Sequence, residues 1–438
     1  MKKFIYYTSL LIVITYIVYF SLIIYDVGSW EYGGCVILEK VQQMSQGKPL
    51  YPHVIGLNEP VYTWPYMPLS AVIYEYYYLL FHGNIKLLTF ASFIMFVMTG
   101  VITGIIASKI AGKNIILPTL AMFLTPIFIT KMGSVPRVDT VALFFLSLSI
   151  LEHEHKHDKM STIYFLLAFL SKQTYIFSLP FLYIYEKKFK NFAVLISALL
   201  LCLLILLVVS TGFYENVILF TRSQTIDNLA KIYDYINFTL SMYFVTGMLV
   251  MFIISLQTRK KNYLYLFILL SLIASVMMMK SGSSVNYYYQ PLFVLSIIAG
   301  DALAKIKRPK IILSTILILF ILQLALSSVP YRVNVLKTID RIVTGNVFSD
   351  DACIDSNHYD WFFLNQYGKK GLWSWNKVSM SIALHKYDYI VLYNQTYAGY
   401  VAQRIDSNIY TIITQKYDTY TTVVDKVNTV VIYTPKRG

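Results

Sequence analysis

Long apolar runs recur along the chain up to residue 328, and they leave few folds open to it. Eleven of them predict membrane spans, at residues 4–25, 86–108, 115–131, 138–152, 160–171, 174–186, 192–212, 236–257, 262–279, 289–304 and 311–328. Repeated runs of this kind are typical of helices in a lipid bilayer. Hydrophobic residues make up 57% of the chain and charged residues 14%. Soluble domains average about 45–50% and 25%. We therefore predict an α-helical polytopic membrane protein, not a soluble or disordered chain.

The net charge of +14 indicates how the chain is oriented in the membrane, not that it binds nucleic acid. The basic residues stand in short clusters after alternate spans, at residues 2–3, 109–113, 156–159, 187–190, 259–261 and 305–310. Such clusters favour the cytoplasmic side of a membrane. The N-terminus is then cytoplasmic, and the first run is a retained span, not a signal peptide. The richness in Ile, Lys and Tyr fits a bacterium with an AT-rich genome, so the expected location is a bacterial plasma membrane.

Lys172 decides the topology, because it stands in the middle of residues 160–186. If these residues formed one span, the basic clusters at 187–190, 259–261 and 305–310 would all lie outside. A lysine at mid-membrane would also cost about 3 kcal/mol or more. Two short spans that meet at Lys172 on the outer side avoid both problems, and this is the arrangement that we predict.

Three segments are not spans. Residues 26–85 form a first extracytoplasmic loop, in which the amphipathic stretch 68–82 indicates an interfacial helix. Residues 213–235 form a shorter outer loop. Residues 329–438 have a soluble composition.

Strand-like runs in this tail, at 389–393 and 429–433, alternate with polar helical stretches. The tail is therefore predicted to be a small extracytoplasmic α/β domain at 329–438. It follows a transmembrane domain at 1–328.

The sequence gives little evidence for a metal site. The three cysteines, Cys35, Cys202 and Cys353, have no metal-ligand spacing. Cys35 and Cys353 share the outer side and are able to form a disulfide, although unpaired thiols are the preferred interpretation. The His-rich run at 152–158 is a candidate metal site. It lies on the cytoplasmic side, however, and a solvated loop is favoured. The first outer loop has no Asp-x-Asp spacing, so no divalent metal or other cofactor is predicted.

Two acids follow the first span. Asp26 and Glu31 lie close to Trp30, at the expected water interface. Carboxylates in such a place are candidates for a general base. An ordinary solvated loop explains these residues equally well when they are taken alone.

Several cations stand on the outer side, where the charge rule predicts few: Arg137, Lys172, Arg222 and Lys280. Arg137 alone would be explained by pairing with Asp139, and Lys172 by reaching toward the interface. Together they indicate an anionic ligand, for which a membrane-embedded phosphate is the natural candidate. An outer carboxylate with outer cations suits group transfer from a lipid phosphate, which leaves as a stable anion.

The chain resembles integral-membrane glycosyltransferases of the GT-C superfamily. It is similar to the branch of the protein O-mannosyltransferases and the bacterial aminoarabinose and lipopolysaccharide-core sugar transferases. The resemblance rests on Trp30-Glu31-Tyr32-Gly33, Gly47-Lys48-Pro49-Leu50-Tyr51, Tyr66-Met67-Pro68-Leu69, Arg137-Val138-Asp139, Ser171-Lys172-Gln173-Thr174 and Asn286-Tyr287-Tyr288. These motifs extend over most of the membrane part.

The resemblance implies an inverting transfer on the extracytoplasmic face. The donor would be a polyprenyl-phosphate-linked sugar, and the acceptor hydroxyl would belong to a lipid, a glycan or a protein. An acid of the first outer loop would be the base. Glu31 is favoured by its spacing before Gly47 and Tyr51, and Asp26 is second. Relatives near the aminoarabinose transferases often have adjacent Asp and Glu here, which this chain lacks.

The remaining site residues are expected from the outer cations and from the motifs quoted above. Those expected at the donor phosphate are Arg137, Lys172, Lys280 and Arg222. Those expected to line the pocket are Trp30, Tyr66, Asp139, Gln173, Asn286, Tyr287 and Tyr288. The tail resembles the small outer domain that many members carry.

Two other functions fit a polytopic chain with outer cations. A transporter or flippase for lipid-linked glycans would more often show an internal repeat and ionisable residues at mid-membrane. A polysaccharide polymerase would use the same lipid carriers. The ionisable residues here gather on one face, which favours a one-sided active site.

Overall fold

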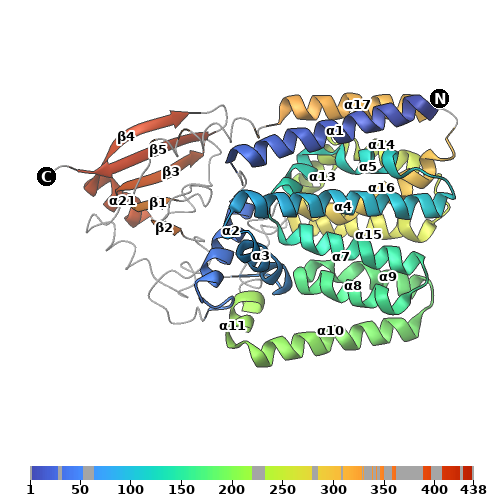
Figure 1. Cartoon of the computed structure of the whole chain (residues 1–438), viewed down its shortest axis with the longest axis horizontal. Coiled ribbons are helices and arrows are strands. Elements are labelled where there is room, and N and C mark those ends of the chain that lie inside the picture. The colour runs from blue at the N-terminus through green and yellow to red at the C-terminus, as the bar shows by residue number, and fades with distance from the viewer. Residues whose placement is uncertain are drawn as a thin grey trace.

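A bundle of helices carries a small β-sheet at one end in the computed structural model (Figure 1). The structure describes residues 2–27, 32–52, 64–219, 232–278, 285–306, 309–327, 346–349, 358–361, 388–395, 407–424 and 428–436, with residues 329, 338 and 342. The unbroken long helices are α1 (Lys2–Val27), α4 (Ile85–Ala111), α7 (Val138–Glu154), α8 (Asp158–Ser171), α10 (Phe189–Val209), α15 (Lys261–Met278), α16 (Tyr289–Leu303) and α17 (Pro309–Leu326).

Three further apolar runs are interrupted. The first comprises α5 (Ile116–Leu124), α6 (Ile127–Thr130) and the 3₁₀ turn η1 (Lys131–Ser134), with a bend of 73°. The second comprises α13 (Ile232–Val245) and α14 (Met248–Ser255), with a bend of 86°. The third comprises η2 (Gln173–Phe177) and α9 (Ser178–Tyr185).

Local chemistry explains the two sharp bends. Pro126 stands between α5 and α6, and proline has no N–H to continue a helix. Gly247 stands between α13 and α14 with a φ of +78°, a left-handed conformation that favours glycine.

All eleven predicted apolar runs fall on helical segments of the described chain. By length and composition, five helices are able to cross a membrane alone, or seven when each sharply bent pair counts as one. The chain is an integral membrane protein, and the number of eleven crossings stays a prediction.

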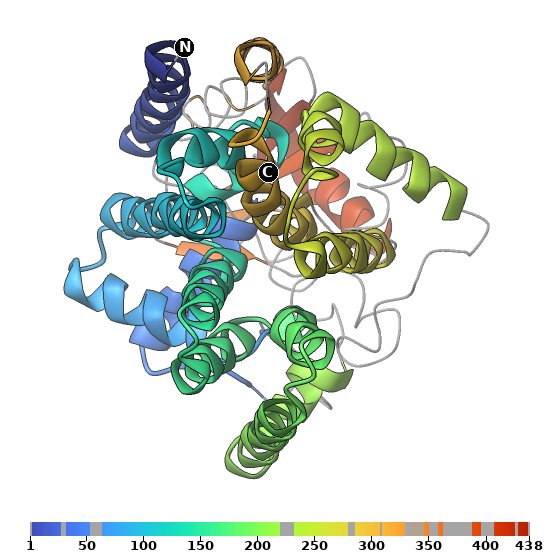
Figure 2. The same ribbon diagram turned by 90° about the vertical axis from the view of Figure 1, so that its right-hand side faces the viewer.

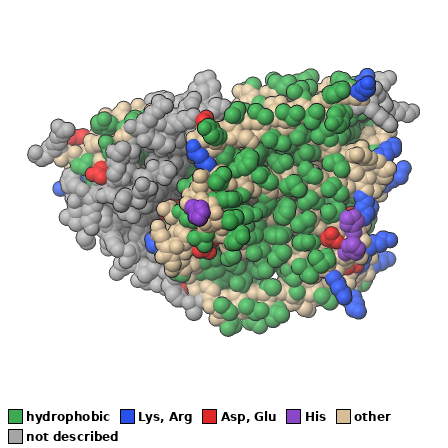
Figure 3. Space-filling view, in the orientation of Figure 1, with side chains coloured by type: hydrophobic (Ala, Val, Ile, Leu, Met, Phe, Trp, Pro, Cys, Tyr) green, Lys and Arg blue, Asp and Glu red, His purple; other side chains and the backbone are tan. Residues whose placement is uncertain are grey.

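Burial separates the centre of the bundle from its lipid-facing surface. Every residue of α16 is buried, and this helix packs against α4, α5, α14 and α15. By contrast, α10 lies at the periphery (Figure 2), with Leu200, Leu204 and Val208 exposed. Apolar side chains cover the flank of the bundle, and Lys and Arg gather at one end of it (Figure 3). A surface of this kind is expected where lipid replaces water.

We call the end with the lysine clusters the basic end, and the opposite end, where α2, α3 and the sheet lie, the loop end. Two ion pairs show how α8 and α9 run between them. Asp158, at the start of α8, lies 3.0 Å from the Nζ of Lys188, and His153 Nε2 lies 3.2 Å from Glu186. The start of α8 and the residues after α9 therefore share the basic end, and the chain reverses near Lys172. This confirms the reversal predicted at Lys172.

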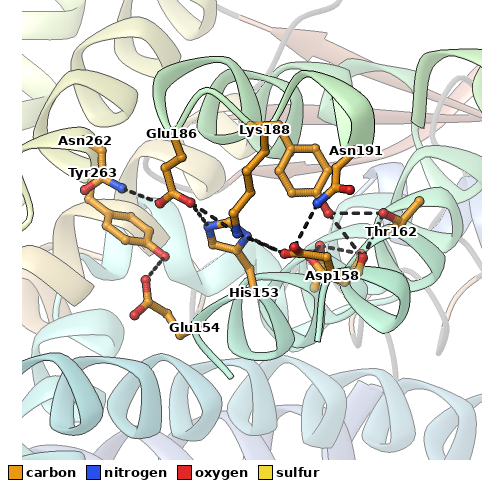
Figure 4. Close-up of polar contacts among 12 residues, drawn as sticks. His153, Glu154, Asp158, Thr162, Glu186, Lys188, Asn191, Asn262 and Tyr263 are labelled. Atoms are coloured by element: carbon orange, nitrogen blue, oxygen red, sulfur yellow. Dashed lines mark hydrogen bonds and ion pairs between the residues drawn. The ribbon is translucent and has the colours of Figure 1, made fainter. Parts of the chain in front are cut away.

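Polar contacts join several helix ends at the basic end (Figure 4). Glu154 accepts hydrogen bonds from Lys260 at 3.0 Å and from Tyr263 at 2.9 Å. Asn262 donates to Glu186 at 3.2 Å. These contacts tie α7 and α9 to α15, and they place the basic residues 187–190 and 259–261 at the same end of the bundle.

The loop end holds α2 (Tyr32–Ser45), α3 (Leu69–Leu80), α11 (Thr211–Phe213) and the π-helical turn η3 (Tyr214–Leu219). The helix predicted at 68–82 is thus present as α3. Cys35 in α2 is disulfide-bonded, whereas Cys202 is free. The expectation of an unpaired thiol at Cys35 is therefore wrong. Cys353 lies outside the described residues.

The C-terminal segment forms a five-stranded sheet in the order β2-β1-β3-β5-β4. Its elements are β1 (Asn346–Ser349), β2 (His358–Trp361), β3 (Tyr389–Gln395), α21 (Ser407–Lys416), β4 (Tyr417–Val424) and β5 (Asn428–Pro435). β1 is parallel to β2 and β3, and β5 is antiparallel to β3 and β4. The two strands predicted from sequence are neighbours, since Ile390 pairs with Tyr433. The domain boundary at 328 and 329 stays a prediction.

Candidate functional site

A buried ion pair marks the loop end of the bundle. Asp139 is the second residue of α7, and Lys172 follows the last residue of α8. The two helices pack together as an antiparallel hairpin, so these positions meet. The Nζ of Lys172 lies 2.7 Å from Oδ1 of Asp139, and each side chain is 2% exposed.

Asn286 and Tyr175 complete the shell around Asp139. The Nδ2 of Asn286 donates to Oδ2 at 2.6 Å, so each carboxylate oxygen has a partner. The hydroxyl of Tyr175 donates to the backbone carbonyl of Asp139 at 3.2 Å. A buried carboxylate needs compensation of this kind, since desolvation of an ion costs several kcal/mol. We call Asp139, Lys172 and Asn286 the central cluster.

Two aromatic rings lie against the ammonium group of Lys172. The Nζ is 4.5 Å from the ring centre of Tyr287 and 5.8 Å from that of Tyr66. Both distances suit cation–π attraction, which strengthens when the pair is shielded from water. Burial raises the pKa of Tyr66, and the positive charges of Lys172 and Arg137 partly oppose that rise. The Tyr66 phenol is therefore neutral and able to donate a hydrogen bond.

Arg137 lies beside the central cluster on a fixed backbone. Its N–H donates to the Tyr74 hydroxyl at 3.0 Å, and that hydroxyl donates to the Arg137 carbonyl at 2.9 Å. Tyr74 comes from α3, so this helix holds the backbone of Arg137 in place. The guanidinium is 3.7 Å from the sulfur of Met132, and Arg137 is 8% exposed. A second cation is thus held close to Lys172.

The site is recessed from the end of the bundle. The Tyr74 hydroxyl lies 2.9 Å from Oγ of Ser92, seven residues into α4. At 1.5 Å per residue, this depth is about 10 Å below the end of α4. The backbone of Arg137, which bonds to the same hydroxyl, therefore also lies inside the bundle.

The segment that leads into α3 packs over the Lys172 turn. Gln173 Nε2 donates to the Pro65 carbonyl at 2.9 Å, and Ser70 Oγ donates to the Ser171 carbonyl at 3.3 Å. The Tyr51 hydroxyl donates to the carbonyl of Tyr66 at 2.9 Å. These contacts fix the ring of Tyr66 beside Lys172.

Asn216 in η3 fastens this segment to the one after α10. Its Oδ1 accepts the Trp64 N–H at 3.1 Å, and its Nδ2 donates to the carbonyls of Pro52 at 2.6 Å and Gly212 at 2.8 Å. A side chain at Gly212 would collide with the Tyr51 carbonyl, so glycine permits this close approach. Segments about 150 residues apart are joined by one buried amide.

The structure gathers six of the residues predicted for the site: Arg137, Asp139, Lys172, Asn286, Tyr287 and Tyr66. Gln173 adjoins them through Pro65. Tyr288 points elsewhere, because its hydroxyl lies 2.6 Å from Thr239 and its ring packs on Tyr243. Asp26 is exposed at the end of α1. The predictions for Glu31, Trp30, Arg222 and Lys280 lie outside the described residues.

Three residues of the site were not predicted: Tyr74, Tyr175 and Asn216. Each is uncharged and acts through a backbone partner far along the chain. The signal in the sequence that could have identified Tyr74 and Tyr175 is that each stands shortly after one of the quoted motifs.

No family model matches the sequence, and no curated protein matches it. Solved structures do match. The crystal structure of ArnT from Cupriavidus metallidurans bound to undecaprenyl phosphate superposes with a TM-score of 0.60. The match covers 96% of this chain and 97% of ArnT, with 10% identical residues. The chain shares its fold with ArnT. The apo structure of ArnT gives a TM-score of 0.62 with the same coverage and identity.

The likeness shows a shared fold, so the helical membrane fold with a small C-terminal sheet that the sequence predicts is confirmed. Since 96% of the chain takes part in the match, it includes helices and sheet alike. The likeness to ArnT establishes the architecture in which the central cluster lies, and the chemistry has to be argued from the residues.

Proposed function

We propose that this chain is an inverting glycosyltransferase. It moves a sugar from a polyprenyl-phosphate-linked donor to an acceptor hydroxyl on the extracytoplasmic face. The observation that carries the proposal is the buried cation Lys172, held by Asp139 at 2.7 Å with Arg137 nearby, at the loop end of a chain with the ArnT fold. ArnT itself has been crystallised with undecaprenyl phosphate.

Asp139 has a positioning role in this proposal. The carboxylate of Asp139 lies 2.7 Å from the Nζ of Lys172 and holds that group in one place. Asn286 and the Tyr287 ring fix the orientation of the pair. The ammonium group is therefore oriented before the donor arrives.

The donor phosphate binds between Lys172 and Arg137. An ammonium offers a point charge, and a guanidinium offers a planar fork of N–H donors that matches phosphate oxygens. The phosphate shares Lys172 with Asp139 and does not displace it, because a lysine has three N–H donors. Lys280 and Arg222, the other cations predicted on the outer side, are further candidates for the same phosphate.

Glu31 is the proposed base, with Asp26 second. The carboxylate removes the proton of the acceptor hydroxyl, whose oxygen attacks the anomeric carbon of the donor sugar. The bond between that carbon and the phosphate oxygen breaks, and the electron pair leaves with the polyprenyl phosphate. The cations stabilise the charge that develops on this leaving group. Attack opposite the leaving group inverts the anomeric centre.

The basic end supports the proposed sidedness. Lysine-rich ends favour the cytoplasm, and the exposed Lys113, Lys156 and Lys190 all lie at that end. The loop end, with the central cluster, then faces the extracytoplasmic side. The donor lipid remains in the outer leaflet, and its phosphate enters the recess beside α3 and α4.

A transfer assay tests the proposal. Purified wild-type protein in liposomes is given radiolabelled polyprenyl-phosphate sugars together with native membrane extract as the acceptor. We expect labelled acceptor with the wild type, with Lys86→Met as a matched control, and none with Glu31→Gln. Lys86 is a suitable control because it is also a cation at the loop end, but among the described residues its Nζ contacts Tyr25, with 2.7 Å to the carbonyl, and not the central cluster.

Lys172→Met separates binding from chemistry in the same assay. We expect the apparent KM for the donor to rise at least tenfold, with folded protein recovered in normal yield. Donor movement across the bilayer without labelled acceptor would instead identify a transporter. Equal transfer by wild type and Glu31→Gln would remove Glu31 as the base and direct the test to Asp26→Asn.

A further inference from the structure

Glu152, His155 and His157 form a second group of side chains able to do chemistry, at the basic end. Within the described part of the chain, it is the one set of three His, Cys, Asp or Glu residues with converging ligand atoms, all within 4.8 Å of one another. We propose that this group binds a divalent transition-metal ion such as Zn²⁺. The inference does not depend on the proposed transfer reaction, because the group lies at the opposite end of the α7–α8 hairpin from the central cluster.

The end of α7 brings the three side chains together. The N–H of His157 donates to the Glu152 carbonyl at 2.9 Å, and the N–H of Lys156 donates to the His153 carbonyl at 3.0 Å. This pair of bonds is the Schellman motif, which requires one residue in the left-handed conformation. Lys156 is that residue, with a φ of +64°. The motif folds His157 back beside the last turn of α7, where Glu152 lies.

The run at 152–158 divides into an inward and an outward set. His153, Glu154 and Asp158 point into the polar contacts between helices and have protein partners there (Figure 4). Glu152 and His157 contact each other instead, and His155 and His157 are exposed with their rings 5.9 Å apart. The outward set is therefore not needed to hold the helices together and remains accessible to an ion.

The donor atoms suit zinc. Imidazole nitrogen binds Zn²⁺ at about 2.0–2.1 Å and carboxylate oxygen at about 2.0–2.2 Å. Tetrahedral ligands at these distances lie about 3.3 Å apart. Glu152 Oε2 and His157 Nδ1 are 2.7 Å apart, and all ligand atoms lie within 4.8 Å of one another. Small rotations of the exposed side chains bring these atoms to the spacing that zinc needs. Water fills the fourth position. One carboxylate and two neutral imidazoles leave a net positive charge, which the solvent at this exposed surface screens.

Binding has a structural consequence for the hairpin. Glu152 belongs to α7, and His157 is the residue before α8, so an ion held by both joins the two helices at their turn. Ligand binding to the folded state alone stabilises it by mass action. Zn²⁺ should accordingly raise the melting temperature of the protein and should do so through these residues.

The test uses the purified full chain in detergent, without a polyhistidine tag, titrated with Zn²⁺ in a calorimeter after treatment with a chelator. We expect one Zn²⁺ per chain for the wild type and for His82→Ala, a matched control because His82 is exposed at the other end of the bundle. His155→Ala/His157→Ala should weaken binding at least tenfold, and so should Glu152→Gln. Zn²⁺ should raise the melting temperature of the wild type and not that of the double variant.

Melting in the absence of metal shows whether each variant is folded, so a lost signal is not confused with unfolding. The proposal is overturned if the wild type shows no binding up to 100 µM Zn²⁺, roughly the range of weak adventitious sites. It is also overturned if the double variant binds as the wild type does. Unchanged binding by Glu152→Gln would reject the three-ligand site.

Discussion

Lys172 and Asp139 are 33 residues apart in sequence, and their charged groups lie 2.7 Å apart at the loop end of the α7–α8 hairpin. Both side chains are almost fully buried. Neither charge is tolerable there alone, because an isolated buried ion is costly. The pair therefore both closes the hairpin and keeps a cation ready at the site where the donor phosphate is proposed to bind.

Removal of both members of this pair should destabilise the protein by less than the sum of the two single removals. Lys172→Met leaves a buried carboxylate, and Asp139→Asn leaves a buried ammonium. Each should lower the free energy of unfolding by about 3 kcal/mol. The double variant leaves neither charge alone, so its loss should be smaller than the sum of the two. Chemical unfolding in detergent, run as a double-mutant cycle, measures the coupling. Strictly additive losses would mean that the pair contributes no mutual stabilisation.

The ring of Tyr287, not its hydroxyl, should support donor binding. Its centre lies 4.5 Å from the Lys172 ammonium. Tyr287→Phe retains that ring face and should bind the donor like the wild type, whereas Tyr287→Leu should bind roughly tenfold more weakly. Tyr288→Leu is the matched control, because the Tyr288 hydroxyl contacts Thr239 instead. Equal donor affinities for Tyr287→Leu and Tyr288→Leu, measured in folded protein, would contradict a cation–π role.

Asn216→Ala should loosen the chain around Pro52 and Trp64. The change removes the partner of the Trp64 N–H and two donors to carbonyls, in a buried place. Unmet buried groups cost about 1 to 3 kcal/mol each. We expect a lower melting temperature and faster proteolysis within residues 32–69. Asn114→Ala, at an exposed position of the basic end, serves as the comparison and should change neither. Proteolysis of these residues at the wild-type rate would show that Asn216 does not fasten them.

Much of this architecture could be predicted from the sequence, because membrane solvation gives strong local signals. Apolar runs locate the helices, and the position of Lys172 between basic clusters correctly predicts the reversal of the chain. The alternation in 389–393 and 429–433 identifies two strands that the structure pairs. These features depend on residues close together in sequence, which is why a pattern records them.

The rest depends on partners that only the fold brings together. Residues 115–131 and 236–257 resemble straight spans, yet Pro126 and Gly247 bend them sharply. Asn216 has no charge or motif, and its importance comes from Trp64 and Pro52 in a distant loop. Tyr288 belongs to the same motif as Tyr287 but points to the other side, because neighbouring residues of a tight turn face different directions.

Acid should destabilise the basic end through Glu186. Burial raises the pKa of this carboxyl, but the hydrogen bond and charge of His153 and the charge of Lys188 outweigh burial and lower it to about 2 from 4.5. A group whose pKa is lower in the folded state contributes stability above its unfolded pKa. That stability is lost as the pH falls from about 4.5 toward 2. Thermal melting at pH 6 and pH 3 should show a smaller acid-induced drop for Glu186→Gln than for the wild type. An equal drop in both proteins would assign the acid sensitivity to other carboxyls.

The proposed sidedness predicts where an impermeant thiol reagent reacts in intact cells. Cys202→Ser removes the free thiol seen among the described residues, and Cys35 is already in a disulfide. In that background, a cysteine in strand β3 made by Asn394→Cys should be labelled from outside. A cysteine at the basic end made by Lys190→Cys should be labelled only after permeabilisation. The unaltered Cys202→Ser background measures any labelling of other thiols. Because the lysine clusters and the central cluster occupy opposite ends of one bundle, the reverse pattern would invert the whole chain. The Lys172 site would then face the cytoplasm, and an extracytoplasmic lipid donor would have no access to it.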